Sequence, residues 1–183
     1  HRNADTAIVG KALGTASLGI YNLGYQFVLM PLTYISRSFD RVMLTTLSRV
    51  QDDHAQLAGI YLKSVQAISS ITFPLMALVA CAAPSLIPLA LGERWALASP
   101  LIPVFCLIGA TQSVVWNMGT VFNARGRAEI TLRISAVVFV ASVTAFLIGV
   151  RWGVAGVVVS YALATLLVSS YLVTVVTGFL NLR

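Results

Sequence analysis

The polar and charged residues that interrupt the apolar stretches of this chain are the ones whose chemistry could matter. Asp5, with Asn3 two positions before it, lies in an apolar segment near the start of the chain. An ionisable group inside an apolar membrane helix usually faces a cavity or a partner, because burying it in hydrocarbon is costly. Asp5 is therefore a candidate cavity-lining carboxylate. The alternatives are exposure at a helix end and a structural pair with Arg2.

Arg37, Asp40 and Arg41 form a second group, at spacing i, i+3 and i+4. This spacing puts all three side chains on one face of a helix. Two guanidinium groups on one face can bind an anionic head group through charge-assisted hydrogen bonds. The alternative is that both arginines extend their charged ends to a membrane interface, with Asp40 as their partner.

Uncharged polar and aromatic residues form a third group, suited to a ligand rich in hydroxyl groups. Tyr21 and Tyr25 are one helical turn apart, with Asn22 and Gln26 directly after them. Gln112 and Trp116 share a helix face, with Asn117 one position further on. Such residues can stack on sugar rings and bond to their hydroxyls. An interfacial aromatic belt and hydrogen bonding between helices explain the same residues without any ligand.

Several patterns of enzymes and cofactor-binding proteins are absent from the sequence. There is no Walker A loop, which ATP hydrolysis of the P-loop type requires. His1 and His54 are the only histidines, and Cys81 and Cys106 both lie in apolar runs, so no metal-ligand spacing occurs. We therefore expect no enzymatic activity, no cofactor and no metal.

Five runs without a charged residue supply the elements that must position these groups. They are Ala12–Ser36, Ser64–Gly92, Trp95–Ala124, Ile134–Val150 and Trp152–Leu182. A bilayer core about 30 Å thick is crossed by ~20 apolar residues in a helix. Only 10% of the chain is charged, against ~25% in an average soluble domain. The sequence predicts an all-α polytopic membrane protein, embedded among membrane lipids.

We predict one transmembrane helical lobe over residues 1–183. Its elements are a half-helix at about 3–13 and spans at about 18–39, 65–81, 101–122, 132–150 and 154–177. Asp53, followed three residues later by Gln56, predicts a helix start before the second span. The prolines and the glycine between residues 84 and 100 predict a loop with little regular structure.

Lysine and arginine are distributed unequally between the two sides of the predicted bundle. The connections Ser36–Ser64 and Asn123–Arg133 hold seven of them, whereas the opposite side holds only Lys11, Arg94 and Arg151. The positive-inside rule places the first side in the cytoplasm. Topology thus accounts for the net charge of +6. A basic stripe with interleaved aromatic residues is missing, so we expect no nucleic-acid partner.

A series of short motifs runs in order along nearly the whole chain. They are NADTAIVGKALG (3–14), LGIYNLGY (18–25), LSRVQDD (47–53), TFPLM (72–76), LGERW (91–95), GR (126–127) and IGVRWG (148–153). In this order the chain resembles the Wzx-like polysaccharide flippases of the multidrug/oligosaccharidyl-lipid/polysaccharide exporter superfamily. It looks most similar to the branch that acts on exopolysaccharide repeat units.

The resemblance implies one lobe, about helices 7–12, of a two-lobe transporter in the bacterial inner membrane. Such a protein moves undecaprenyl-diphosphate-linked oligosaccharides for exopolysaccharide or O-antigen by alternating access through a polar, cationic cavity. Asn3, Asp5, Arg37 and Arg41 are the binding candidates that the resemblance carries over. The expected partners are the lipid-linked oligosaccharide, membrane lipids and the polymerase or export machinery.

Two other functions stay open at this point. The first is a cation-coupled multidrug antiporter of the same superfamily, in which Asp5 would bind the ion or a cationic drug. An antiporter of that kind needs an acidic cavity, and the chain has only six acidic residues. The second is a membrane scaffold that transports nothing but takes part in a polysaccharide assembly complex.

Overall fold

A computed structural model describes residues 2–50 and 53–180 of the chain, without the side chains of 2–5, 7, 27, 31, 35–39, 41, 54, 90, 91, 94 and 96. The described residues form helices and no strand. The helices are α1 (Arg2–Arg49), α2 (His54–Leu91), α3 (Ile102–Val115), α4 (Met118–Ala124), α5 (Ala128–Gly149) and α6 (Gly153–Phe179). Two 3₁₀ segments, η1 (Glu93–Leu101) and η2 (Val150–Trp152), connect α2 to α3 and α5 to α6.

Three stretches of the described residues are long and apolar enough to cross a membrane, by length and composition. They are Ala55–Leu89, Leu97–Ala124 and Ala128–Phe179. The third has 52 residues and contains both α5 and α6, so it folds back on itself. The prediction of an all-α polytopic membrane protein is confirmed.

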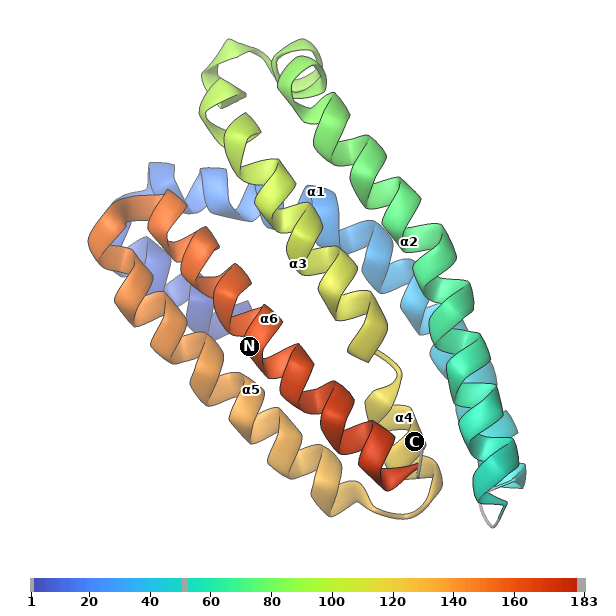
Figure 1. The fold of residues 1–183 in the computed structure, drawn as a ribbon. Coiled ribbons are helices and arrows are strands. Elements are labelled where there is room, and N and C mark those ends of the chain that lie inside the picture. The colour runs from blue at the N-terminus through green and yellow to red at the C-terminus, as the bar shows by residue number, and fades with distance from the viewer. Residues whose placement is uncertain (1, 51–52, 181–183) are drawn as a thin grey trace.

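The connections between helices gather at two ends of the bundle (Figure 1). The α1–α2 turn, the α4–α5 turn and the end of α6 lie toward one end, whereas η1 and η2 lie away from it. The two connections rich in arginine therefore lie at the same end. This is the arrangement that the positive-inside prediction requires.

Helix α1 bends sharply at Gly14 and then continues well past the predicted span. Gly14 has φ 84° and ψ 173°, a backbone conformation that residues with a Cβ atom rarely adopt. Because of the bend, a Cβ atom placed on Gly10 would lie 3.1 Å from Cδ2 of Leu18. After Gly14 the helix runs on to Arg49 without another non-helical residue. This long part of α1 carries most of the candidate residues.

The predicted start of the second long helix is confirmed at Asp53. The carboxylate Oδ1 of Asp53 accepts a hydrogen bond of 2.9 Å from the backbone N–H of Gln56. The backbone N–H of Asp53 donates to the carbonyl oxygen of Val50 at 3.0 Å. Asp53 therefore caps α2 and also closes the turn that leads to it.

The prediction of a loop between residues 84 and 100 is wrong. Helix α2 continues through Pro74, Pro84 and Pro88 to Leu91, and η1 follows directly. Membrane helices tolerate proline because neighbouring helices hold the segment in place. Ala83 and Ile87 directly precede Pro84 and Pro88. Both are buried in the core, so packing keeps this part helical. The helix ends only at Gly92, at φ 90°.

The predicted third span is interrupted in the structure. Helix α3 ends at Val115 and α4 begins at Met118, with Asn117 at φ −80° and ψ 1° between them. The end predicted for this span is confirmed at Gly126, which has φ 70°. There the N–H of Arg127 donates to Phe122 at 2.9 Å, as in a glycine-based helix end.

Small residues let three pairs of helices approach closely. A Cβ atom on Gly24 of α1 would lie 2.5 Å from the Phe105 ring of α3, and one on Gly109 of α3 would lie 3.2 Å from Met76 Sδ of α2. One on Gly156 of α6 would lie 2.5 Å from the carbonyl oxygen of Gly149 of α5. The α5–α6 pair is therefore in backbone contact at Gly156, and α3 is held between α1 and α2.

A candidate binding pocket beside a helix break

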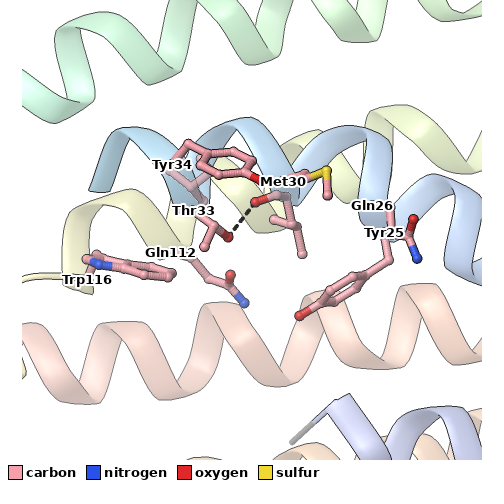
Figure 2. A pocket seen from close by; sticks show the side chains of 9 residues that line it. Tyr25, Gln26, Met30, Thr33, Tyr34, Gln112 and Trp116 are labelled. Atoms are coloured by element: carbon pink, nitrogen blue, oxygen red, sulfur yellow. Dashed lines mark hydrogen bonds between the residues drawn. The ribbon is translucent and has the colours of Figure 1, made fainter. Parts of the chain in front are cut away.

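A cavity of about 250 Å³ lies along α1 and α3. Its lining residues are Tyr25, Gln26, Leu29, Met30, Leu32, Thr33, Tyr34, Gln112 and Trp116. All nine are uncharged, and they combine three aromatic rings with two amides and a threonine. Figure 2 shows Gln112 between the rings of Tyr25 and Trp116, with the hydroxyl end of Tyr25 turned toward Gln112.

Helix α1 contributes one side of the pocket through residues about one turn apart. Tyr25, Leu29 and Thr33 follow each other at steps of four, which keeps them on the same face. The Thr33 hydroxyl donates to the Leu29 carbonyl oxygen at 2.7 Å. Met30 and Tyr34 are 51% and 64% exposed, so they form the open rim of the pocket.

An aromatic cluster beneath the pocket holds Tyr25. Its ring stacks on Tyr21 with the ring centres 5.9 Å apart and meets Phe105 edge-on at 6.4 Å. Phe146 of α5 meets Tyr21 edge-on at 6.3 Å and lies 5.0 Å from the ring of Tyr161 of α6. The cluster joins α1, α3, α5 and α6, and it fixes the position of the Tyr25 ring at the pocket wall.

Helix α3 contributes the opposite side through Gln112 and Trp116. The side-chain N–H of Gln112 donates to the Tyr161 hydroxyl oxygen at 3.1 Å, which ties α3 to α6. The prediction that Gln112 and Trp116 share one helix face is confirmed, since both line the pocket.

Asp40 of α1 is bonded to both sides of the α3–α4 break. The indole N–H of Trp116 donates to Oδ2 of Asp40 at 2.8 Å, and the hydroxyl of Thr120 in α4 donates to Oδ1 at 3.3 Å. The indole N–H is thus used by the carboxylate and not by a ligand. The side chains of Arg37 and Arg41, for which pairing with Asp40 is one of the two interpretations of the sequence, lie outside the described residues.

Asn117 lies on the buried side of the break and not in the pocket. It is 1% exposed, and neither atom of its amide has a hydrogen-bond partner. The hydroxyl of Thr72 in α2 is also buried without a partner. Met76 of α2 lies against Gly109 of α3, and Thr72 and Ser113 each lie four residues from this contact, toward the same end of the two antiparallel helices (Figure 1). Polar groups therefore continue along the α2–α3 interface.

The structure separates the predicted site residues into three groups. Tyr25 lines the pocket, whereas Tyr21 and Asn117 lie in the core at 1% exposure each. The side chains of the four predicted ionic and amide residues lie outside the described residues; these are Asn3, Asp5, Arg37 and Arg41. The sequence analysis missed five lining residues, namely Leu29, Met30, Leu32, Thr33 and Tyr34. Counting four-residue steps forward from Tyr25 would have found two of these, Leu29 and Thr33.

The chemistry of the pocket is that of hydrogen bonding and stacking. Its polar atoms are amide and hydroxyl groups, which match the hydroxyls of a neutral ligand. Among the described residues no group of three His, Cys, Asp or Glu side chains could hold a metal ion.

Comparison with known proteins identifies the family. The family described as "Polysaccharide biosynthesis protein" matches residues 1–100, more than half of the 183 residues. The chain belongs to this family. The matched part includes α1 with the Asp40 carboxylate and the α1 side of the pocket.

Curated relatives carry names from the same area of biology. An "Uncharacterized membrane protein in cps region" of Klebsiella pneumoniae is 28% identical over 85% of this chain and 32% of its own length. The "Lipopolysaccharide biosynthesis protein WzxC" of Escherichia coli K12 is 25% identical over 94% of this chain and 36% of its own length. The "Teichuronic acid biosynthesis protein TuaB" of Bacillus subtilis is 27% identical over 70% of this chain and 26% of its own length. The chain spans about a third of the length of these relatives. No solved structure matches it.

Proposed function

We propose that the chain is one lobe of a transporter in the bacterial inner membrane. The transporter moves undecaprenyl-diphosphate-linked oligosaccharide repeat units from the cytoplasmic to the outer leaflet by alternating access. The observation that carries this proposal is the pocket, which gathers amides, hydroxyls and aromatic rings along two helices of a membrane bundle. Membership of the polysaccharide biosynthesis family supports it.

The physical need for such a pocket follows from the substrate. Sugar hydroxyls would lose their hydrogen bonds to water in a hydrocarbon layer about 30 Å thick, and unsatisfied polar groups there cost several kcal/mol each. A transporter must replace those bonds along the path, and amides such as Gln112 can do so. The polyprenyl tail is apolar and can remain in the surrounding bilayer.

The diphosphate needs positive charge, which the described lining residues of the pocket do not supply. Arg37 and Arg41 follow the pocket residues along α1, one to two turns beyond Tyr34. We propose that these two guanidinium groups hold the diphosphate by charge-assisted hydrogen bonds. The chemistry is transport, without a catalytic residue or a cofactor.

The test uses the full-length protein in a strain from which the gene has been deleted. We expect the doubly substituted Arg37→Ala/Arg41→Ala protein to export much less polymer than wild type at the same protein level. Lipid-linked repeat units should accumulate on the cytoplasmic face. Arg133→Ala is the matched control, because Arg133 is exposed on α5, and it should leave polymer export unchanged.

Two results would point elsewhere. Normal polymer yield from the double variant would sink the role of these arginines. Normal polymer yield in the deletion strain itself, together with raised susceptibility to cationic drugs, would favour the multidrug antiporter. A scaffold protein would tolerate substitution of any residue that lines the pocket. Polymer export would be lost only in variants that disturb helix packing.

A further inference from the structure

We propose that the pocket between α1 and α3 is a subsite for one uncharged sugar ring, with Trp116 as its stacking surface and Asp40 as a positioning residue. This proposal rests on the proposed function, and it specifies which part of the substrate binds in the pocket. The sugar end of the lipid-linked unit binds here, and the diphosphate binds elsewhere.

Size and charge both favour a single neutral ring. The cavity volume of about 250 Å³ lies just below the range of roughly 300–1,000 Å³ typical of pockets for drug-sized ligands. It is too small for a whole oligosaccharide. None of the nine lining residues is charged. Among the described lining residues, a diphosphate would lose its hydration without meeting a cation, which is very unfavourable.

The walls have the chemistry that a pyranose ring requires. One side of a sugar ring is made of C–H groups, and these bind the electron-rich face of an aromatic ring. Tyr25, Tyr34 and Trp116 provide aromatic surface, while Gln26 and Gln112 provide amide groups for the hydroxyls. Tyr25 and Gln112 are themselves held by partners beneath the pocket, so the ligand meets a largely preformed site.

Asp40 determines how Trp116 meets the ligand. The 2.8 Å hydrogen bond from the indole N–H fixes the plane of the ring, and the second bond from Thr120 anchors the same carboxylate to α4. Because the N–H is bonded to Asp40, Trp116 offers the pocket aromatic surface and not a free donor. Asp40 is not among the lining residues, so it acts through Trp116.

The test measures ligand binding to the full-length protein in lipid nanodiscs by calorimetry. The probes are the water-soluble oligosaccharide released by mild acid from the strain's own lipid-linked unit, and inorganic pyrophosphate. We expect Trp116→Leu to weaken oligosaccharide binding about tenfold, as for loss of one aromatic contact. Trp116→Phe keeps an aromatic ring but loses the N–H that bonds to Asp40, so it should weaken binding about as much as removal of the Asp40 acceptor. Trp152→Leu, at the 69% exposed Trp152 of η2, should bind like wild type.

Substitutions of Asp40 separate positioning from a general structural effect. Asp40→Asn keeps an oxygen that can accept from the indole N–H, so binding should stay within about threefold of wild type. Asp40→Leu removes the acceptor and should weaken binding about as much as Trp116→Leu. The Asp40→Leu/Trp116→Leu double variant should bind the oligosaccharide no more weakly than Trp116→Leu alone, because both changes remove the same contact.

The outcomes that overturn the subsite are distinct from those that overturn the proposed function. Unchanged binding by Trp116→Leu, competition between pyrophosphate and the oligosaccharide, or equal loss in Asp40→Asn and Asp40→Leu would each refute the subsite. If wild type restores polymer export but does not bind the released oligosaccharide, the subsite fails and the transport function stands. If wild type binds the oligosaccharide through Trp116 but does not restore export, the subsite stands and the transport function fails.

Discussion

Adding a single methyl group at Gly156 should destabilise the α5–α6 pair. A Cβ atom at this position would lie 2.5 Å from the carbonyl oxygen of Gly149 and 2.6 Å from Cβ of Trp152. Both are far inside van der Waals contact. They belong to the backbone or are attached directly to it, so neither can move aside by a change of rotamer. The two helices would have to separate.

Two effects of opposite sign set the magnitude. Overpacking of a close contact costs about 1–3 kcal/mol, whereas alanine in place of glycine favours a helix by up to ~1 kcal/mol. Because backbone atoms make the clash, we take the upper part of the first range and expect a net loss of about 1–2 kcal/mol. Gly59 of α2 has no atom within 4 Å of such a Cβ position. Gly59→Ala should therefore gain up to ~1 kcal/mol.

The assay is reversible unfolding of the full-length protein in mixed micelles titrated with a denaturing detergent. The two variants should differ by about 1–3 kcal/mol in free energy of unfolding, with wild type between them. A Gly156→Ala protein as stable as Gly59→Ala would refute the reasoning. It would mean that the helices are not in backbone contact at Gly149.

Three further predictions test the Asp53 cap of α2, the buried hydroxyl of Thr72 in α2 and the orientation of the chain in the membrane. Asp53→Ala should lower the free energy of unfolding by about 1 kcal/mol through loss of the α2 cap, with Asp53→Asn close to wild type; equal losses in both would contradict this. Thr72→Val should leave stability unchanged or raise it by up to ~1 kcal/mol, because the buried hydroxyl has no partner, and a clear loss would reveal a bond that this arrangement lacks. On a cysteine-free background, a membrane-impermeant maleimide should label Arg151→Cys in spheroplasts and Arg133→Cys only after lysis; the reverse pattern would invert the predicted topology.

Features that depend on local sequence could be predicted. The charge-free runs gave the approximate positions of the helices, since hydrocarbon excludes charge whatever the tertiary fold. Asp53 and Gly126 act on residues within one turn of themselves, and both helix ends occur as predicted. The common face of Gln112 and Trp116 follows from four-residue spacing alone.

Features that depend on distant partners could not be predicted. The carboxylate of Asp40 accepts from Trp116, 76 positions away, a partner that no local spacing indicates. Asn117 follows Trp116 directly, but one position is about 100° around a helix, and the break at this point leaves Asn117 in the core. Tyr21 and Tyr25 share a face. Phe105 and Phe146 pack against Tyr21 and bury it in the core, whereas Tyr25 lines the pocket.

The length of α2 has a consequence outside the bilayer. With 38 residues at about 1.5 Å each, α2 is roughly 57 Å long. Even at a steep tilt of about 40°, a 30 Å hydrocarbon core takes up only ~26 of those residues. About a dozen must extend into water, carrying the α1–α2 turn with them. We therefore expect the start of α2, beside the arginine-rich connection, to form a helical arm outside the hydrocarbon core, where soluble enzymes, proteases and antibodies can reach it.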